Sequence, residues 1–135
     1  CALPICIEGM NKMLGTAALV SGTAVDELRS PQAHELRLVG RIIAKGKTEH
    51  TTVYEVLDIL PPSQRALRRK TRQQFERALD SFRQGELSTA RERLQEILAI
   101  DPDDGPAAMY LSRCEEYARQ GLPSDWDGSV HLSHK

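Results

Sequence analysis

The sequence has little of several features that would assign a protein class directly. Its 135 residues include three cysteines, at positions 1, 6 and 114, and only 4% aromatic residues. Such a cysteine set forms neither a close ligand pair nor a disulfide framework, so it predicts a reduced, cytoplasmic compartment. No apolar run approaches the roughly 20 residues that would span a bilayer. A membrane span within these residues is therefore excluded, and the cysteines fit a reduced compartment better than a secreted, disulfide-stapled scaffold.

The sequence also lacks an excess of charge of one sign. Eighteen Lys and Arg residues face nineteen Asp and Glu residues, giving a net charge of -1. No global field draws such a chain onto nucleic acid or anionic lipid, so no nucleic-acid partner is expected. With 40% hydrophobic and 27% charged residues the chain reads as one globular domain or two small ones. Because it begins at Cys1 without a signal-type segment, we expect its amino end to be a cut in a longer parent protein.

Residues 1–60 have the mixed pattern of an α+β fold. Two apolar strands are joined by the glycine-containing segment from Lys45 to His50, which predicts a β-hairpin. Strict alternation along the first strand would place Leu36, Leu38 and Ile42 on one face and Arg37 and Val39 on the other. The expected elements in order are a helix over 5–14, a strand over 17–20, a helix over 23–29, and strands over 35–44 and 51–57.

The character of the chain changes at Pro61 and Pro62, and the remainder is helical. Three apolar stripes predict one helix through Phe75 and Phe82, one over 87–98, and one that opens after Asp104 and ends at Gly121. We divide this half into a basic linker or helix start over 61–70, helices over 71–121, and a tail over 122–135.

The first two helices have a more specific spacing. Ala78, Ala90, Leu94 and Pro102 stand where a tetratricopeptide repeat of about 34 residues has them. An ordinary helical hairpin is an equally good interpretation. A single repeat cannot bury its own faces, so this unit should dock on a protein partner.

Several residues that could carry chemistry have simpler interpretations. His131 and His134 lie in a polar tail without further ligands, so no metal site is predicted. The basic run from Arg65 to Arg72 is expected to be solvated or to pair with the acidic segment 101–127 of this chain. Trp126, the only tryptophan, is expected to anchor the tail on a domain.

Lys45 and Lys47 flank Gly46 at the predicted hairpin tip, where two ammonium groups could reach a polyphosphate. The run from Leu38 to Glu49, continuing into Val53-Tyr54-Glu55-Val56, resembles the terminal hairpin of class III adenylate/guanylate cyclases. Upstream, Ile7-Glu8-Gly9-Met10-Asn11-Lys12, Gly15-Thr16 and Leu19-Val20-Ser21 are similar to the stretch after that family's catalytic Asn and Arg. Downstream, the run from Ile100 to Pro106 and Asp125-Trp126-Asp127-Gly128 resemble an extension of many bacterial members. The resemblance therefore covers nearly the whole chain in one order.

The resemblance implies that residues 1–60 are the carboxyl-terminal part of a cyclase domain of ferredoxin-like parentage. Such a parent converts ATP or GTP to a 3',5'-cyclic nucleotide and pyrophosphate, with two magnesium or manganese ions and a site shared across a homodimer. The family's metal aspartates have no counterpart in this chain, and Ala2 and Cys6 stand where its Asn and Arg would be. Only the substrate-phosphate role of the hairpin lysine carries over, to Lys45 or Lys47, with Lys45 favoured.

We therefore expect a cyclase fragment that is inactive alone, with no catalytic or metal-binding residue of its own. Its parent would be cytoplasmic or anchored to a membrane through upstream segments. The alternative is a non-catalytic helical protein-interaction module that the short α+β half supports.

Overall fold

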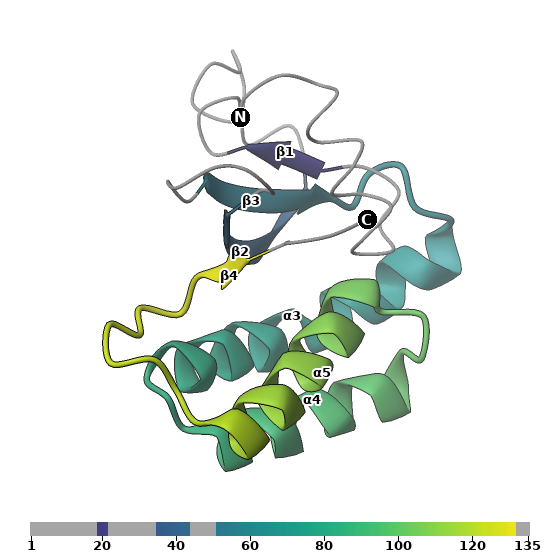
Figure 1. Ribbon diagram of the computed structural model, residues 1–135. Coiled ribbons are helices and arrows are strands. Elements are labelled where there is room, and N and C mark those ends of the chain that lie inside the picture. The colour runs from purple at the N-terminus through teal and green to yellow at the C-terminus, as the bar shows by residue number, and fades with distance from the viewer. Residues whose placement is uncertain (1–18, 22–34, 44–50, 132–135) are drawn as a thin grey trace. The chain divides into compact units, whose positions relative to one another are not determined.

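The computed structural model describes residues 19–21, 35–43 and 51–131 (Figure 1). The predicted α+β class with three consecutive helices is confirmed. The chain falls into two compact units, a sheet unit of Cys1–Arg65 with Ser129–Lys135 and a helical unit of Ala66–Gly128. The helices expected over 5–14 and 23–29 lie outside the described residues.

Among its described residues, the sheet unit contains a four-stranded sheet. Its strands are β1 (Leu19–Ser21), β2 (Leu36–Ile43), β3 (Thr51–Val56) and β4 (Val130–His131). Their order is β1-β3-β2-β4, in which β3 pairs antiparallel with β1 and β2, and β4 pairs parallel with β2. The antiparallel β2–β3 pair is the predicted hairpin, and its strands match the predicted bounds to within one residue at each end.

A β-bulge in β2 overturns the predicted alternation of its faces. Leu38 pairs with Tyr54 and Gly40 with Val53, so Val39 is an extra residue in the ladder. Gly40 has φ of +133°, a conformation that side chains rarely allow. The bulge shifts the phase of the strand, so Val39 and Ile42 are both fully buried although strict alternation placed them on opposite faces.

The core of the sheet unit is aliphatic. Its fully buried side chains include Val39 and Ile42 of β2, Val53 of β3 and Leu57 just after β3. The Leu57 amide donates to the Glu35 carbonyl at 2.9 Å, which extends the β2–β3 pairing by one step. Branched aliphatic residues suit a pleated sheet because they fill the space between neighbouring strands.

The helical unit is built from α3 (Pro62–Arg83), α4 (Leu87–Ile100) and α5 (Gly105–Gln120). The first turn of α3, up to Arg65, belongs to the sheet unit. Proline suits the first turn of a helix because its missing N–H would have no intrahelical acceptor there. The chain leaves α3 through Gly85, with φ of +82°, and leaves α5 through Gly121, with φ of +87°. Both glycines were predicted as helix ends.

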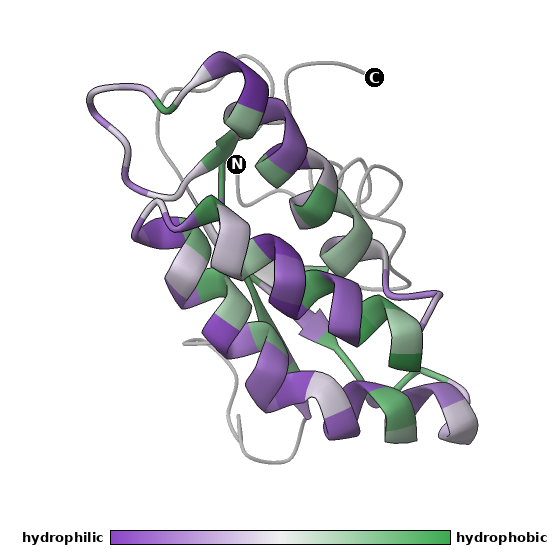
Figure 2. Ribbon diagram, turned by 90° about the horizontal axis from the view of Figure 1, so that it is seen from below, coloured by the Kyte–Doolittle hydropathy of each residue, from purple (hydrophilic) through white to green (hydrophobic). Residues whose placement is uncertain are grey.

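Each helix buries one stripe, and Figure 2 shows hydrophobic and hydrophilic residues alternating along all three helices. The shared core is aromatic at its centre. The Tyr110 ring of α5 lies edge-on to Phe75 and Phe82 of α3, with centroids 6.0 and 5.0 Å away. Ala90, Leu94 and Ile97 are the buried residues of α4. Ala78 of α3 and Ala90 of α4 are both buried, as expected for small residues on the packed faces of neighbouring helices.

Candidate functional site

The predicted phosphate-binding lysines belong to the connection between β2 and β3. Ile42 pairs with Thr51, so the two strands are still in register where residues 44–50 begin and end. Lys45 and Lys47 themselves lie outside the described residues. What the structure describes is the pair of strands that supports this connection and the groups that hold those strands together.

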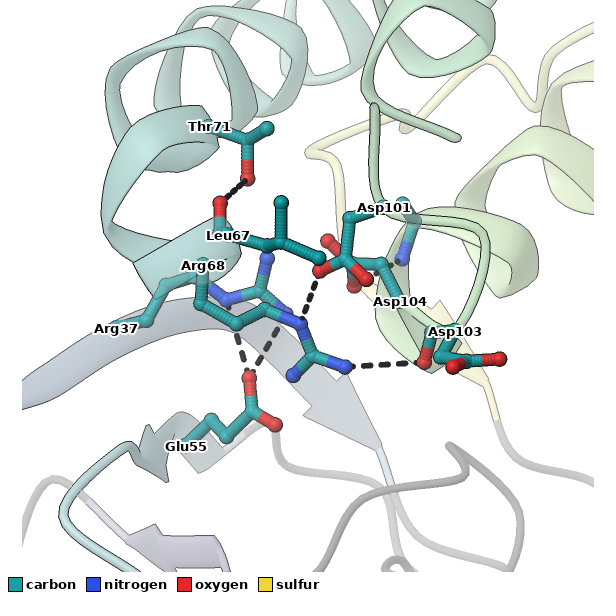
Figure 3. A network of polar contacts seen from close by, with 9 residues as sticks. Arg37, Glu55, Leu67, Arg68, Thr71, Asp101, Asp103 and Asp104 are labelled. Carbon is teal, nitrogen blue, oxygen red and sulfur yellow. Dashed lines mark hydrogen bonds and ion pairs between the residues drawn. The ribbon is translucent and has the colours of Figure 1, made fainter. Parts of the chain in front are cut away.

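A buried ion pair connects β2 and β3 across their ladder of backbone hydrogen bonds. Arg37 and Glu55 are direct cross-strand partners, and both are almost fully buried. The Arg37 guanidinium donates from Nε at 3.1 Å and from Nη2 at 2.8 Å to Oε1 of Glu55 (Figure 3). Two donors on one carboxylate oxygen fix the geometry of the pair, and burial makes a lost partner costly. The pair therefore fixes the register of the strands that lead to Lys45 and Lys47.

The edge of β2 carries a strand that the sequence did not predict. Val130 pairs with Ile42, and His131 pairs with Ile43. Val130 is 1% exposed, so this short strand contributes a buried side chain as well as backbone pairing. The only sequence signal was the alternation of two apolar residues, Val130 and Leu132, with polar ones, which is too short to predict a strand. The pairing lies at the last two residues of β2, immediately before residues 44–50.

A second buried ion pair lies within the helical unit. Arg68 of α3 donates from Nε to Oδ2 of Asp101 at 2.7 Å and from Nη2 to the Asp103 carbonyl at 2.9 Å (Figure 3). This confirms for Arg68 the expectation that the basic run pairs with the acidic segment of the same chain. Arg72 instead pairs weakly with Glu76, at 3.9 Å on the exposed side of α3.

The turn between α4 and α5 is held by aspartates. Asp104 is the N-cap of α5, and its side chain accepts from the Ala107 amide at 3.2 Å. Asp104 is fully buried, and the neighbouring Asp101 is 1% exposed. A carboxylate at a helix N-terminus satisfies free amides and meets the positive end of the helix dipole. These acidic groups thus have structural roles in the turn.

Trp126 anchors the tail on the helical unit, as predicted. Its Nε1 donates to the Phe82 carbonyl at 3.0 Å, and its ring lies 5.0 Å from Phe82 and 4.9 Å from Tyr117. Gly128 then passes so close to Arg83 that an added Cβ would lie 2.9 Å from the Arg83 Cγ. The tail is therefore fixed at two neighbouring points.

Burial favours the neutral forms of three side chains of the helical unit, Cys114, Tyr110 and Tyr117. Burial raises the pKa of the Cys114 thiol from 9.0 to about 11, with Glu115 adding to the rise and Arg91 opposing it. Burial also raises the pKa of Tyr110, and it is the main cause of the raised pKa of Tyr117. A protonated thiol is a poor nucleophile, so Cys114 is suited to packing rather than to catalysis.

Within residues 19–21, 35–43 and 51–131, no group of three His, Cys, Asp or Glu side chains is arranged to hold a metal ion. Over the same residues, no helix is both long and apolar enough to cross a membrane. Two buried carboxylates are paired with arginines. Glu55 connects β3 to β2, and Asp101 connects the end of α4 to α3. Of these two, only Glu55 lies on a strand that leads into the hairpin connection.

Comparison with known proteins finds a similarity to an adenylate cyclase. Over 112 residues the chain is 29% identical to "Adenylate cyclase, terminal-differentiation specific" of Dictyostelium discoideum. The chain is similar to part of an adenylate cyclase. The match covers 82% of this chain and 5% of that relative, so the chain spans a small fraction of the relative's length. Because the matched stretch is longer than either unit, it includes residues of both. No protein-family model and no solved structure matches the chain.

Proposed function

We propose that this chain is the carboxyl-terminal part of a class III nucleotidyl cyclase, and that it helps a larger protein convert ATP to 3',5'-cyclic AMP and pyrophosphate. The observation that supports this most is the similarity to an adenylate cyclase across both units. The antiparallel β2–β3 pair, with Lys45 and Lys47 in its connection, agrees with the terminal hairpin of that family. GTP remains an alternative substrate.

In the proposed reaction the ribose 3'-hydroxyl gives up its proton to water and its oxygen attacks the α-phosphorus. The bond from that phosphorus to the bridging oxygen breaks, and pyrophosphate leaves. The role of this chain is to present an ammonium group, from Lys45 or Lys47, to the triphosphate oxygens. Charge on the transferred and leaving groups has to be neutralised for such a displacement. Two magnesium or manganese ions would supply most of that neutralisation.

The described residues do not fit those metal ions. Their carboxylates form no cluster of the required kind, and Glu55 and Asp101 are each bound to an arginine. The metal-binding aspartates of the family are therefore expected upstream in the parent, and its homodimer would complete the site. The positions of the family's Asn and Arg lie within this chain and are occupied by Ala2 and Cys6. The proposal has three further parts. The catalytic region of the parent is cytoplasmic. Helices α3 to α5 are an extension of the kind that follows the cyclase domain in many bacterial members, and they dock on a protein partner as tetratricopeptide repeats do.

The first test uses the purified 135-residue chain alone. Incubated with ATP or GTP and magnesium or manganese, it should form no cyclic nucleotide above a blank without protein. Losing the groups that hold the metal ions removes the main source of charge stabilisation. Cyclic nucleotide formation by this chain would overturn the proposal that it is a fragment.

The second test uses the chain joined to the upstream sequence of its parent. Lys45→Ala or Lys47→Ala should lower kcat/KM for ATP by roughly tenfold or more, since a charge-assisted contact to phosphate is lost. Lys70→Ala is the matched control, because Lys70 is an exposed lysine of α3. An active longer chain whose rate survives both hairpin substitutions would refute the phosphate role. A loss with Lys47→Ala alone would assign the role to Lys47 instead of the favoured Lys45.

A further inference from the structure

The ends of α3 and α5 form a surface on which the chain's own tail lies. Phe82 of α3 offers both a ring and a backbone carbonyl, and Tyr117 of α5 adds a second ring 6.4 Å away. Gly85, just after α3, leaves room for the tail, since an added Cβ would lie 2.9 Å from Cδ1 of Leu122. This surface and the tail up to Gly128 all belong to the helical unit.

Three residues of the tail fit three features of this surface. Leu122 lies over the glycine that follows α3. Trp126 donates from Nε1 to the Phe82 carbonyl at 3.0 Å and lies edge-on to the two aromatic rings, with centroids 5.0 and 4.9 Å away. Gly128 approaches Arg83 so closely that an added Cβ would lie 3.0 Å from its Cα. The contacts therefore select leucine, tryptophan and glycine at a spacing of four and then two residues.

Residues 122–128 also have the conformational properties of a peptide ligand. The Trp126 amide donates to the Pro123 carbonyl at 3.2 Å, which closes a turn between the leucine and the tryptophan. A turn that begins with proline is partly formed before binding, so less conformational entropy is lost when the segment binds. The side chains within the turn, from Pro123 to Asp125, are exposed. The segment thus contacts the helices through a few side chains whose separation its own turn sets.

Gly121 connects the segment to α5 at a position free of packing. Its φ is +87°, and among the residues that the structure describes no atom outside its chain neighbours lies within 4 Å of an added Cβ. Rotation at this glycine therefore breaks no side-chain contact of its own. Exchange of an identical element between two copies is a low-cost route to a dimer when such a hinge is present.

We infer that the ends of α3 and α5 are a recognition site for the peptide segment 122–128, and that a second copy of this chain can supply the segment. None of the contacts requires the segment to be joined covalently to α5. The short tether makes the chain's own segment the favoured occupant, because it holds the segment at an effective concentration in about the millimolar range. Exchange therefore needs two copies held together. The homodimer of the parent, which belongs to the proposed function, would hold them so, whereas recognition of the segment does not rest on it.

Nuclear magnetic resonance with an acceptor and a donor copy of the full chain tests the exchange. The acceptor is isotope-labelled and carries Leu122→Ser and Trp126→Ser, which remove the two large side chains of its own tail from the site. The unlabelled donor carries Tyr117→Leu, which keeps its tail and weakens its own site. At about 1 mM, the donor should shift the acceptor amides of residues 82–85 and 117. The matched control donor, with Tyr117→Leu and Trp126→Ser, should leave them unshifted.

A synthetic peptide of residues 122–128 with blocked ends measures recognition without a dimer. It should give the same shifts in the acceptor, with half-saturation in about the millimolar range, because a short peptide loses much entropy on binding. Trp126→Phe in the peptide keeps a ring but loses the Nε1 donor, and should weaken binding about two- to tenfold. Leu122→Ala should weaken it roughly tenfold. Ser124→Ala, at an exposed position, is the matched control and should change binding less than about twofold.

Each result decides one part of the inference. No shift with the peptide would overturn the recognition site, and shifts with the peptide but none with the donor would overturn supply by a second copy. Protection of the amides around Ala90 and Leu94 shows whether the acceptor is folded. If it is not, the labelled wild-type chain takes its place, since its one tryptophan gives one indole N–H resonance. Peptide at about 10 mM should move that resonance toward its position in the free segment, and an unmoved resonance would overturn recognition. No arm measures cyclase activity, so failure of the proposed function would leave these results unchanged.

Discussion

Each unit contains a buried pair of an arginine and a carboxylate, but the two pairs connect different kinds of segment. In the sheet unit, Arg37 and Glu55 face each other across neighbouring strands of one hairpin. In the helical unit, Arg68 reaches from α3 to Asp101 at the end of α4 and continues to the Asp103 carbonyl. The first pair links segments that already share a ladder of backbone hydrogen bonds, whereas the second links segments that share none.

This difference indicates in which unit the buried ion pair contributes more to the free energy of unfolding. A cross-strand pair mainly specifies register, because the ladder would otherwise tolerate a slip. A pair between a helix and an interhelical turn also supplies partners for backbone groups that the helices leave free. We therefore expect a larger loss of stability when the helical pair is broken than when the sheet pair is weakened.

The largest expected effect is that of Asp101→Ala, which should lower the free energy of unfolding of the helical unit by roughly 3–5 kcal/mol. It leaves the Arg68 guanidinium buried without its carboxylate. Urea unfolding followed by the fluorescence of Trp126, the only tryptophan, measures it. Asp103→Ala is the control, since Arg68 uses only the Asp103 backbone carbonyl and the side chain is exposed. Equal effects of the two substitutions would contradict the assignment.

A smaller effect is expected for Glu55→Gln in the sheet unit. The substitution keeps the volume but removes the charge that faces Arg37, at a cost of about 2–3 kcal/mol. Amide exchange of residues 36–38 and 54–56 reports it, because no tryptophan lies in this unit. The exposed Glu96→Gln on α4 is the control and should leave these amides unchanged. If Glu55→Gln lowered the free energy of unfolding as much as Asp101→Ala, the two ion pairs would not differ in their contribution to stability.

The pH dependence of the helical unit should reveal its buried thiol. Burial raises the pKa of Cys114 from 9.0 to about 11, so the folded state retains a proton that the unfolded state releases first. Stability from this source is complete below about pH 9 and is lost as pH rises toward 11, by about 2 kcal/mol in all. Unfolding free energies of the wild type and Cys114→Ala, compared from pH 7 to 11, should therefore converge as pH rises. Parallel profiles would show that the thiol is not buried in solution.

The smallest expected effect concerns the cap of α5. Asp104→Ala should lower the stability of the helical unit by about 1 kcal/mol, because the Ala107 amide loses its acceptor. Asp104→Asn keeps an acceptor oxygen and should recover most of the loss. The same Trp126 fluorescence assay ranks these variants against Asp101→Ala. A loss with Asp104→Ala as large as that with Asp101→Ala would mean that the whole turn, rather than the ion pair, carries the stability.

The sequence was most informative where a local signal decides the structure. The three helices follow their apolar stripes, and Gly85, Asp104 and Gly121 mark their ends as predicted. The hairpin strands were also located correctly. Trp126 was correctly interpreted as an anchor because a single large amphipathic ring in a polar tail has few other uses.

Features that depend on residues distant in sequence could not be predicted. The bulge at Val39 arises from the pairing of β2 with β3, and no local signal except Gly40 marks it. The burial of Arg37 follows from Glu55 eighteen residues away, and β4 follows from an edge that only the folded sheet presents. The roles of Lys45 and Lys47 stay predictions, because they rest on a resemblance and lie outside the described residues.

The order of the units along the chain has a consequence for biosynthesis. Since β4 follows all three helices in sequence, a ribosome has to release the whole helical unit before the sheet can receive its outermost strand. Until then the Ile42–Ile43 edge of β2 is open, and open strand edges are where nascent chains associate wrongly. Fast local folding of the helices would shorten that interval, because contacts close in sequence form first. A chain stalled or truncated before Val130 would keep a complete helical unit while its sheet still lacked a strand.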